Sequence, residues 1–590
     1  MDNSLLHHLP DELLEAIASL LPPADTLAFG STCRRGNKIA YEHLIWRAHC
    51  VLGWQYWEPK HELEEKLKQP PVATQWRKLY NERSKTDKKA LDTFEEMLST
   101  QQHRFQRMEE INAVGYDAKD VLLNLRNNTP DDAEDVLARR WHADAVLGQI
   151  HRRTAIGKWR RLQRRQMVRL EEVLGSFDLF VLGGSKGDLN ELDQEFDRLA
   201  EAVRHEYDGF DDMSIRDKAT HVADYLRKQQ LVGNPDIENY HALRNNFLSM
   251  ALFDEVHTSL PLQSVAIYCA VARRLGVNAK PSNYPEHVHA VVEAPSDVSL
   301  DGRSRVAIPD AEPELMFMDP WRQSEEVPQD QLTLRLSQMG VPPTQHGSHL
   351  GAGSNLAIAL RTGRNIMYSV QDARDRQRGT TRRSSHPDPE LAWYSMLWSM
   401  MVLGDPDPAA ALVRRRQCLP YLAEHFQQHY PWDIGFVENI IVPMFDGDRE
   451  LHVLMHMITT HRAGDRNAKA PCPRDSDEKN NDVKFKVGQH FQHKRYGYEG
   501  FIIGWDHKCS AEPRWIQQMR VDDLPRGREQ PFYNVVADDK SQRYVAEENI
   551  SRMYMKPGDN MMQLAGRYFK RWDDDNKAFV SNLRDEYPDD

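Results

Sequence analysis

Short helices are predicted at the start of the chain. Four apolar residues there recur at the spacing of one face of an α-helix, and they are Leu9, Leu13, Ile17 and Leu20. Pro22 and Pro23 would end this helix, Asp25 can cap a second one, and residues 39–46 form a third amphipathic segment. Three helices this short bury little apolar surface, so we expect them to dock onto a partner.

The middle of the chain combines an apolar helix with two short strands. In "TSLPLQSVAIYCAVARRLGV" Thr258 or Ser259 can cap a helix, Pro261 suits its first turn, and Gly276 closes it. "AVVEA" alternates as a strand after "NYPEHV", and "PELMFMDPW" predicts a second strand. From residue 484 the period becomes alternating and is interrupted by glycines, which predicts a small antiparallel β-barrel.

Composition narrows the class of protein. The 590 residues exceed one hydrophobic core, so several domains are expected. The net charge of −13 argues against nonspecific attraction to nucleic acid or anionic membranes. Six scattered cysteines give neither a disulfide framework nor a zinc pattern, and about 18 consecutive apolar residues occur nowhere. We therefore expect a cytoplasmic or nuclear protein with no membrane contact, no metal site and no cofactor.

The N-terminal segment resembles an F-box. Leu9 to Leu13 read L-P-x-E-[LI], and Thr32-Cys33-Arg34-Arg35 and Ile45-Trp46 match later landmarks. An ordinary three-helix core is the alternative. The resemblance implies binding to a Skp1-type adaptor, and hence to a cullin-based ubiquitin ligase. The residues predicted to contact the adaptor are Leu9, Pro10, Glu12, Leu13, Ile17, Leu27 and Trp46.

Residues 189–338 resemble the transglutaminase-like superfamily, and more closely its SirB-type branch. The motifs that carry the resemblance are "NNFLSMAL", "LPLQSVAIYCAVARRLGV", "NYPEHV" and "FMDPW". The catalytic cysteine of active transglutaminases falls at Pro261, while His287 and Asp319 match the base and its orienting acid. The branch also has proline there, but this chain departs from it with Leu260 for isoleucine and Glu286 for glycine. We therefore expect a pseudoenzyme cleft that binds protein or peptide, with His287 and Asp319 as a hydrogen-bonded remnant and His289 partly exposed.

Cys269 is the alternative nucleophile. It lies eight residues beyond Pro261, about 12 Å along the helix axis and about 80° around it. A cysteine on a buried apolar helix usually acts as a small hydrophobic residue. An acyl-transfer or hydrolase enzyme using Cys269 with His287 and Asp319 nevertheless stays open from the sequence.

The C-terminal segment resembles the YccV-like, or HspQ-like, domain. "VGQHFQHKRYGYEGFIIGWD", "QPFYNVV" and "YVAEENI" agree in order and spacing. Families of that name are associated with binding hemimethylated DNA and with substrate delivery to a protease. The candidate surface residues are Lys494, Arg495, Tyr496, Tyr498, Arg526 and Arg528. Nearby acidic residues offset their charge, which favours protein recognition over DNA binding.

The predicted fold class is a multidomain α+β protein. Its expected parts are an F-box (1–55), a helical connector (56–185), a transglutaminase-like α+β core (186–345), a tetratricopeptide-like helical tail (346–462) with a disordered loop near 371–389, a linker (463–483), the barrel (484–556) and a C-terminal tail (557–590). The expected function is substrate recognition in a Skp1-cullin-F-box ubiquitin ligase, with the target protein held by the core and barrel and no catalytic residue. DNA binding through the barrel and thiol catalysis through Cys269 are the alternatives.

Overall fold

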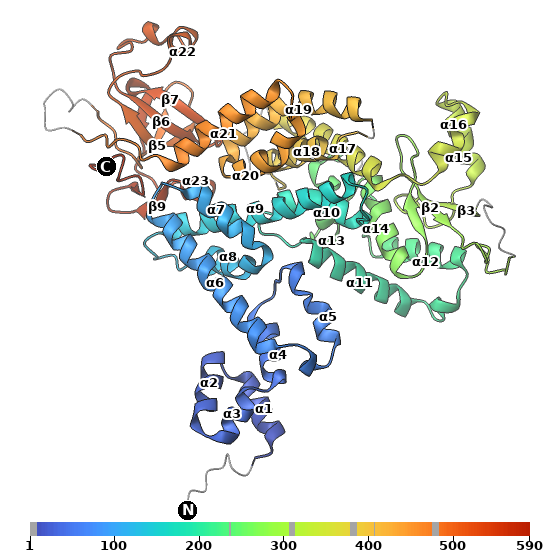
Figure 1. The fold of residues 1–590 in the computed structure, drawn as a ribbon. Coiled ribbons are helices and arrows are strands. Elements are labelled where there is room, and N and C mark those ends of the chain that lie inside the picture. Colours follow the sequence, from blue (N-terminus) through green and yellow to red (C-terminus); the bar gives the residue numbers. More distant parts are fainter. Residues whose placement is uncertain (1–8, 235–237, 306–312, 378–385, 406, 475–482) are drawn as a thin grey trace, which may run out of the picture. The chain divides into compact units, whose positions relative to one another are not determined.

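A computed structural model describes residues 9–234, 238–305, 313–377, 386–405, 407–474 and 483–590. The chain divides into two compact units, one formed by Met1–Ile150 with Pro431–Asp590 and the other by His151–Tyr430. Helix α9 (Val136–Gln163) crosses the division. Figure 1 traces the elements along the chain.

The N-terminal segment forms four helices where the pattern predicted three. They are α1 (Asp11–Leu20), α2 (Pro23–Thr32), α3 (Arg34–Ala40) and α4 (His43–Gly53). Tyr41 and Glu42 interrupt the segment 39–46, so it supplies the end of α3 and the start of α4. Pro22 precedes the first turn of α2, and Asp25 lies within that turn instead of capping it. A small core holds the helices together, made of Leu14, Ala18, Ile39 and Ile45 with Leu9 and Phe29 against it.

A helical connector continues directly from α4. Its helices are α5 (Leu63–Lys68), α6 (Trp76–Ser99), α7 (Arg104–Val114), α8 (Lys119–Asn128) and α9. A tryptophan-rich cluster joins α4 to α6, and its buried members are Trp46, Cys50, Trp54, Trp57, Trp76 and Leu79. The fully buried guanidinium of Arg83 lies beside this cluster, with Nε 3.5 Å from Asp117 Oδ1 and Nη2 3.4 Å from Asp120 Oδ2. These carboxylates compensate a buried charge that would otherwise be costly.

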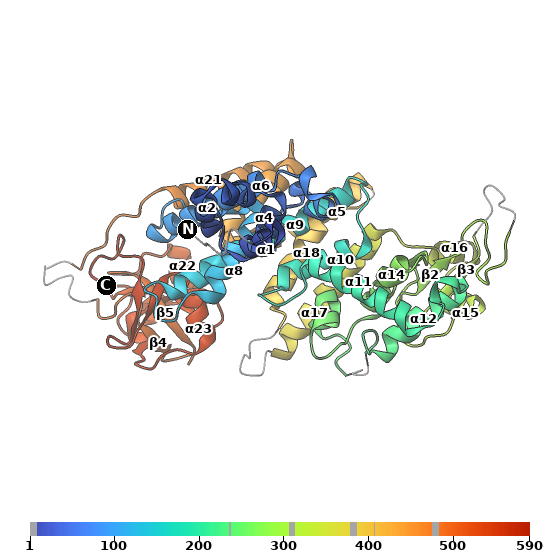
Figure 2. The same cartoon turned by 90° about the horizontal axis from the view of Figure 1, so that it is seen from below.

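In the second unit the apolar helix α14 (Pro261–Arg274) packs among three other helices and a small sheet. The helices are α10 (Leu170–Val181), α11 (Leu189–Glu206) and α12 (Ile215–Lys228), and α13 (Leu248–Phe253) packs against α10 and α11. The strands β1 (Ala279–Pro281), β2 (Ala290–Glu293) and β3 (Leu315–Met318) form an antiparallel sheet in the order β1-β2-β3. Figures 1 and 2 both show this sheet beside α14 and α12.

Five further helices follow the sheet: α15 (Gln329–Gln338), α16 (Pro343–Leu350), α17 (Asn355–Gln377), α18 (Pro389–Leu403) and α19 (Pro408–His429). The loop expected near 371–389 is helical up to Gln377, and residues 378–385 lie outside the described residues. Arg374 explains the extra helical turns, because its guanidinium is 2.8 Å from the Glu390 carboxylate and 5.0 Å from the centre of the Trp393 ring.

The chain then returns to the first unit through α20 (Ile434–Phe436) and α21 (Glu450–Arg466), and α21 packs against α7. Arg462 is 3.0 Å from Glu109 of α7. Asp465 accepts the backbone N–H groups of Phe105 and Gln106 at 2.9 and 3.2 Å. Residues 463–466, expected in a linker, therefore continue a packed helix.

The C-terminal β domain (residues 483–590) contains a five-stranded antiparallel sheet in the order β7-β6-β5-β4-β8. Its strands are β4 (His490–His493), β5 (Glu499–Asp506), β6 (Phe532–Ala537), β7 (Gln542–Ala546) and β8 (Ile550–Arg552), with the short helix α22 (Pro513–Gln518) before β6. Among the described residues β7 and β8 are the two ends of the strand order, so the ladder does not close through them into the expected barrel.

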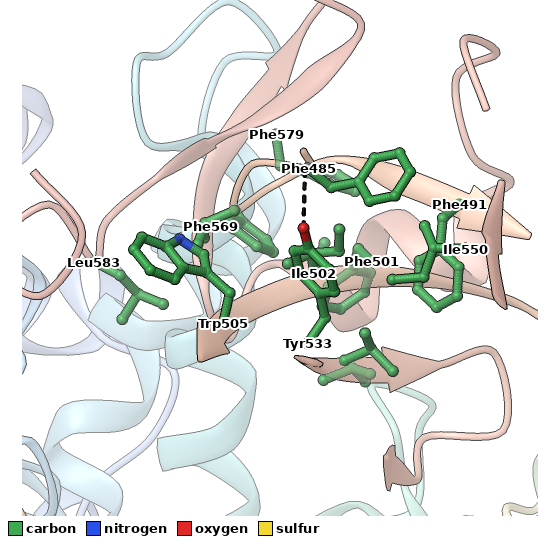
Figure 3. Close-up of a cluster of buried hydrophobic side chains, with 14 of the residues drawn as sticks. Phe485, Phe491, Phe501, Ile502, Trp505, Tyr533, Ile550, Phe569, Phe579 and Leu583 are labelled. Carbon is green, nitrogen blue, oxygen red and sulfur yellow. Dashed lines mark hydrogen bonds between the residues drawn. The ribbon is translucent and has the colours of Figure 1, made fainter. Parts of the chain in front are cut away.

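The segment 557–590, expected as a separate tail, packs into the core of the β domain. It forms α23 (Asp559–Ala565) and a hairpin of β9 (Phe569–Asp573) and β10 (Ala578–Ser581). Phe569 and Phe579 contact the ring of Phe501 on β5, with ring centres 5.4 and 5.6 Å away. Figure 3 shows these rings in one cluster, together with the hydrogen bond from the Phe485 N–H to the Tyr533 hydroxyl at 3.0 Å. A domain boundary at residue 556 would cut through this core.

No helix in the described parts of the chain has the length and apolar character needed to cross a membrane.

Phe579→Ala tests whether the last hairpin belongs to the core. Phe579 is 3% exposed, so we expect the change to lower the stability of the β domain by about 3–5 kcal/mol. Hydrogen exchange of the β5 amides in the full chain measures the loss locally. Tyr554→Ala, at a side chain that is 62% exposed, is the matched control and should stay within about 0.5 kcal/mol. Equal protection in the two variants would show that residues 557–590 are dispensable for this core.

Candidate functional site

Pro261 lies at the first turn of α14, where the superfamily resemblance places a nucleophile. Leu260 precedes the helix in an extended conformation, and its carbonyl accepts the Ser264 N–H at 3.0 Å. Proline suits this position because it has no N–H to satisfy and its φ is already helical. Its ring carries no nucleophilic atom, so residue 261 itself cannot supply the thiol that an active transglutaminase has there.

His287 and Asp319 are brought together as the sequence predicted. Strands β2 and β3 pair antiparallel with Ala290 opposite Met318, so the residues just before β2 meet those just after β3. His287 Nε2 is 2.9 Å from Asp319 Oδ2. Burial alone would raise the pKa of Asp319, but the hydrogen bond and charge of His287 outweigh it and hold that pKa below its usual value. Asp319 is therefore ionised at neutral pH.

His289 is a third member of this group that sequence reasoning placed differently. It was expected to be partly exposed, but its side chain is buried and its ring centre is 5.1 Å from that of His287. Burial lowers the pKa of His289 to about 4, so the imidazole is neutral at neutral pH. The alternation of residues 287 and 289 was the available signal that both rings share one face.

A cavity of about 290 Å³ lies beside the His287–Asp319 pair. Its lining includes Tyr240, Pro261, Glu286, Val288, Arg361 and Tyr368. His287 is not among the lining residues, although both of its chain neighbours are. Its ring instead meets the edge of Trp321, with ring centres 5.6 Å apart, and the Trp321 indole N–H donates to the Ser259 carbonyl at 2.9 Å. The cavity is thus lined by Pro261 but not by the histidine that a hydrolase would use.

Glu286 has a left-handed backbone conformation, with φ at +59°. Glycine adopts this conformation without steric cost, whereas a residue with a Cβ loses about 1 kcal/mol or more. The glycine that the SirB-type pattern has before the histidine would adopt this conformation without that cost. In this chain the residue at the strained position, Glu286, is one of those that line the pocket.

Cys269 does not replace the missing nucleophile. Its thiol is buried in the middle of α14, and burial raises its pKa well above the usual range. The charged groups that act on it are Arg273 and Glu171, not His287. A thiol that stays protonated and enclosed is a packing residue.

The predicted adaptor-binding residues divide between surface and core. Pro10, Glu12, Leu13, Ile17 and Leu27 are exposed, and Leu9 is half-buried against the F-box core. Trp46 was predicted to contact the adaptor, but it is 1% exposed and donates its indole N–H to the Ala40 carbonyl at 2.8 Å. Trp46 is therefore a residue of the protein's own core. Arg35 holds the start of α1 in place, because its guanidinium donates to the Leu9 carbonyl and to Asp11, at 2.5 and 2.7 Å.

Carboxylates and carbonyls already engage most of the candidate basic residues of the β domain. Arg526 is 2.9 Å from Glu547, Arg528 is 2.5 Å from Asp522, and Lys494 donates to the Glu548 carbonyl at 2.8 Å.

The aromatic candidates lie in the turn between β4 and β5, together with Arg495. Tyr496 is 68% exposed, and the guanidinium carbon of Arg495 is 5.4 Å from its ring centre. Tyr498 is half-buried beneath Arg543. Among the candidate residues, Arg495 and Tyr496 are thus the exposed pair, and both lie in this turn.

Thiol labelling of the native chain tests the assignment of Cys269. Cys33 is exposed, and the N–H of Gly36 lowers the pKa of its thiol. We expect iodoacetamide to modify Cys33 first and Cys269 at least about 100-fold more slowly, because the thiolate is the reactive form and Cys269 is enclosed. Mass spectrometry of digests gives both rates, and the same chain in denaturant is the control in which the rates converge. Native rates that match would restore Cys269 as a candidate nucleophile.

Three family models match the chain. An F-box-like model matches residues 6–52, a transglutaminase-like superfamily model matches residues 190–364, and a model described as hemimethylated DNA-binding protein YccV like matches residues 483–576. No solved structure matches.

The chain also matches curated proteins of vertebrates. It is 22% identical to F-box only protein 21 of Homo sapiens and to that of Pongo abelii, and each alignment covers 100% of this chain and 92% of the relative. It is 24% identical to F-box only protein 21 of Mus musculus over 64% of this chain and 56% of the relative. The chain thus contains an F-box-like, a transglutaminase-like and a YccV-like domain in this order, and it is similar over its full length to F-box only protein 21.

Proposed function

We propose that the chain is a substrate-recognition subunit of a Skp1-cullin-F-box ubiquitin ligase. The observation that carries the proposal is an apolar stripe on α1, which we define as Leu13, Ile17 and Leu20. These side chains are 51%, 47% and 81% exposed. They stand at i, i+4 and i+7, so they share one face of the helix. The F-box-like match covers the same residues.

The opposite face of α1 is already used for folding. Leu14 and Ala18 are 3% and 1% exposed and pack against Ile39 and Ile45. Leaving a row of leucine and isoleucine in water is unfavourable unless another surface covers it, and such rows commonly mark protein interfaces. The α1 stripe therefore suits an adaptor that presents an apolar surface of its own.

Helix α4 adds a second exposed apolar face, made of Leu44, Val51 and Leu52. They are 54%, 47% and 73% exposed. Leu44 and Val51 stand at i and i+7 on one side of α4, and Leu52 is exposed in its last turn. Ile45 and Trp46 are buried in the protein's own cores. The F-box thus offers more apolar contact than α1 alone.

The target protein would bind through the transglutaminase-like core and the β domain. The 290 Å³ cavity next to Pro261 has the size for one side chain of a peptide, and Arg361 and Glu286 give it polar groups for orientation. With a proline at the nucleophile position, the chain supplies proximity and orientation while other subunits carry out ubiquitin transfer. Such a ligase would act in the cytoplasm or nucleus.

Substitution of the α1 stripe tests adaptor binding. The double change Leu13→Asp and Ile17→Asp keeps the F-box core intact, but it would bury two charges in the interface. We expect recovery of the Skp1-type adaptor with the purified chain to fall at least about 10-fold, and the cullin to be lost with it. Co-purification of adaptor and cullin with the tagged full chain gives the measurement.

The matched control is Leu334→Asp on α15, where the side chain is 59% exposed. It adds a charge at an exposed leucine outside the F-box and should leave adaptor recovery unchanged. A thermal melt of each variant confirms folding. Equal adaptor recovery with the double variant and with the control would contradict the proposal.

Binding of hemimethylated DNA is the second candidate function. The exposed β4–β5 turn with Lys494, Arg495 and Tyr496 supports it, because a cation beside an exposed ring can contact phosphate and stack on a base. The carboxylates that pair with Arg526 and Arg528 weaken it. The balance of charge favours a protein ligand at this turn.

A DNA titration tests whether the β4–β5 turn binds DNA or a protein ligand. We expect the full chain to bind hemimethylated and unmethylated duplexes equally, with a dissociation constant weaker than about 10⁻⁶ M at physiological salt. Fluorescence anisotropy at two salt concentrations gives the affinities. Tighter, salt-dependent and methylation-selective binding that disappears in the Arg495→Ala, Tyr496→Ala variant would establish the DNA function instead.

A further inference from the structure

We propose that His287, His289 and Asp319 form a binding site for a zinc ion at the end of the β2–β3 pair. The site would lie where the superfamily resemblance places the base and its orienting acid, next to a nucleophile position that holds Pro261. It goes beyond the proposed role in substrate recognition. One ligand atom from each of the three residues lies within 4.8 Å of the other two. Three protein ligands with a further position open to water or a carboxylate are a common arrangement for zinc.

The backbone fixes the three side chains in position. His287 and His289 precede β2, Asp319 follows β3, and the pairing of Ala290 with Met318 holds the two ends side by side. The Ser282 side chain accepts the His289 N–H at 3.1 Å, and the His289 carbonyl accepts the Ser282 N–H at 2.8 Å. Ring contacts with Tyr284 and Trp321 restrain the two imidazoles. A site on strand ends with restrained rotamers needs little rearrangement to bind an ion.

Two buried polar atoms at this place have no hydrogen-bond partner among the described residues. They are His289 Nδ1 and Asp319 Oδ1. The two residues are 1% and 3% exposed. A buried polar atom without a partner costs about 1–3 kcal/mol, so a ligand that pairs with both atoms would stabilise the cluster. The hydrogen bond between His287 Nε2 and Asp319 Oδ2, at 2.9 Å, involves neither His289 Nδ1 nor Asp319 Oδ1.

The chemistry of the donors selects the ion. Two imidazoles and one carboxylate suit zinc, whereas magnesium and calcium prefer oxygen ligands throughout. Iron(II) accepts the same three groups, but zinc lies above it in the general order of affinity. With bonds of about 2.0–2.2 Å, neighbouring ligand atoms around zinc are about 3.4 Å apart. The 2.9 Å contact between His287 Nε2 and Asp319 Oδ2 would therefore lengthen when the ion binds between the two side chains.

The positive charges of Arg322 and Arg335 both act on His289 and oppose a cation there, and Arg322 also lies near Asp319. Arg322 Nη1 is 3.9 Å from Asp319 Oδ2. Its side chain is 47% exposed and can turn into solvent when a cation takes its place. The same movement would free the Asp319 carboxylate to coordinate.

A second cluster of similar composition serves as an internal control. Glu390, His425 and His429 also bring one ligand atom each within 4.8 Å of one another. There the Glu390 carboxylate is bound by Arg374 at 2.8 Å, and His425 Nε2 is 3.0 Å from the Glu390 carbonyl. These groups are already engaged, which makes this cluster the poorer zinc site.

Zinc titration of the full chain tests the site. The purified chain is stripped with a chelator and then titrated with zinc chloride in competition with a chromogenic chelator. We expect one tight site per chain. Even second-shell changes cost 10–100-fold in metal affinity, so Asp319→Asn and His289→Ala should each weaken that site by at least about 100-fold. His429→Ala should leave it unchanged.

Two further readouts keep the test independent of folding. Asp319→Asn preserves side-chain volume, and hydrogen exchange of β2 in the metal-free chain checks that the sheet is intact. Cobalt(II) in place of zinc should give a visible spectrum that Asp319→Asn abolishes. Failure to find a tight zinc site, an unchanged affinity in Asp319→Asn, or loss of the site in His429→Ala would each overturn the assignment.

Discussion

The burial of helix α14 from its first residue to Ala272 is the constraint on which the second unit depends. Every residue from Pro261 to Ala272 is buried. The surrounding helices α10, α11 and α12 and the strands β1 and β2 all take their positions from contact with it. A helix enclosed on all sides can offer function only at its ends. The first turn of α14 and the sheet edge are therefore the places where this unit can bind a ligand, and at the first turn Pro261 stands where the resemblance places a catalytic cysteine.

Local patterns were sufficient to predict the parts of the site that lie on regular elements. The apolar run of α14 and the alternation of β2 follow from the side-chain period. The pairing of His287 with Asp319 followed from the resemblance to the transglutaminase-like superfamily, whose base and orienting acid these residues match. His289 was misplaced because exposure depends on what covers a strand end, which the strand itself does not encode. The left-handed backbone of Glu286 likewise could not be predicted from the sequence, because glutamate gives no signal for a positive φ.

The F-box shows the same limit in another form. A helical period identifies apolar residues but not whether their partner is the same chain or another one. Trp46 and Leu13 both carry the pattern, yet Trp46 closes the chain's own core while Leu13 stays in water. The difference arises from α6, whose Trp76 and Leu79 cover Trp46 from a distance of some thirty residues along the chain. In the C-terminal part the charged turn between β9 and β10 led the sequence analysis to predict a tail instead of a hairpin. The aromatic rings of this hairpin belong to the core of the β domain.

Gly488 joins that hairpin to the sheet through its backbone. Its N–H donates to the Ile502 carbonyl and its own carbonyl accepts the Phe579 N–H, both at 2.8 Å. A Cβ at this position would come within 2.2 Å of the Phe579 carbonyl oxygen, and φ is +88°. A single methyl group at residue 488 would thus push the backbone of Phe579 away from that of residue 488, and so separate two segments that lie some ninety residues apart in sequence. The pairing of the last hairpin with the sheet therefore requires glycine at residue 488.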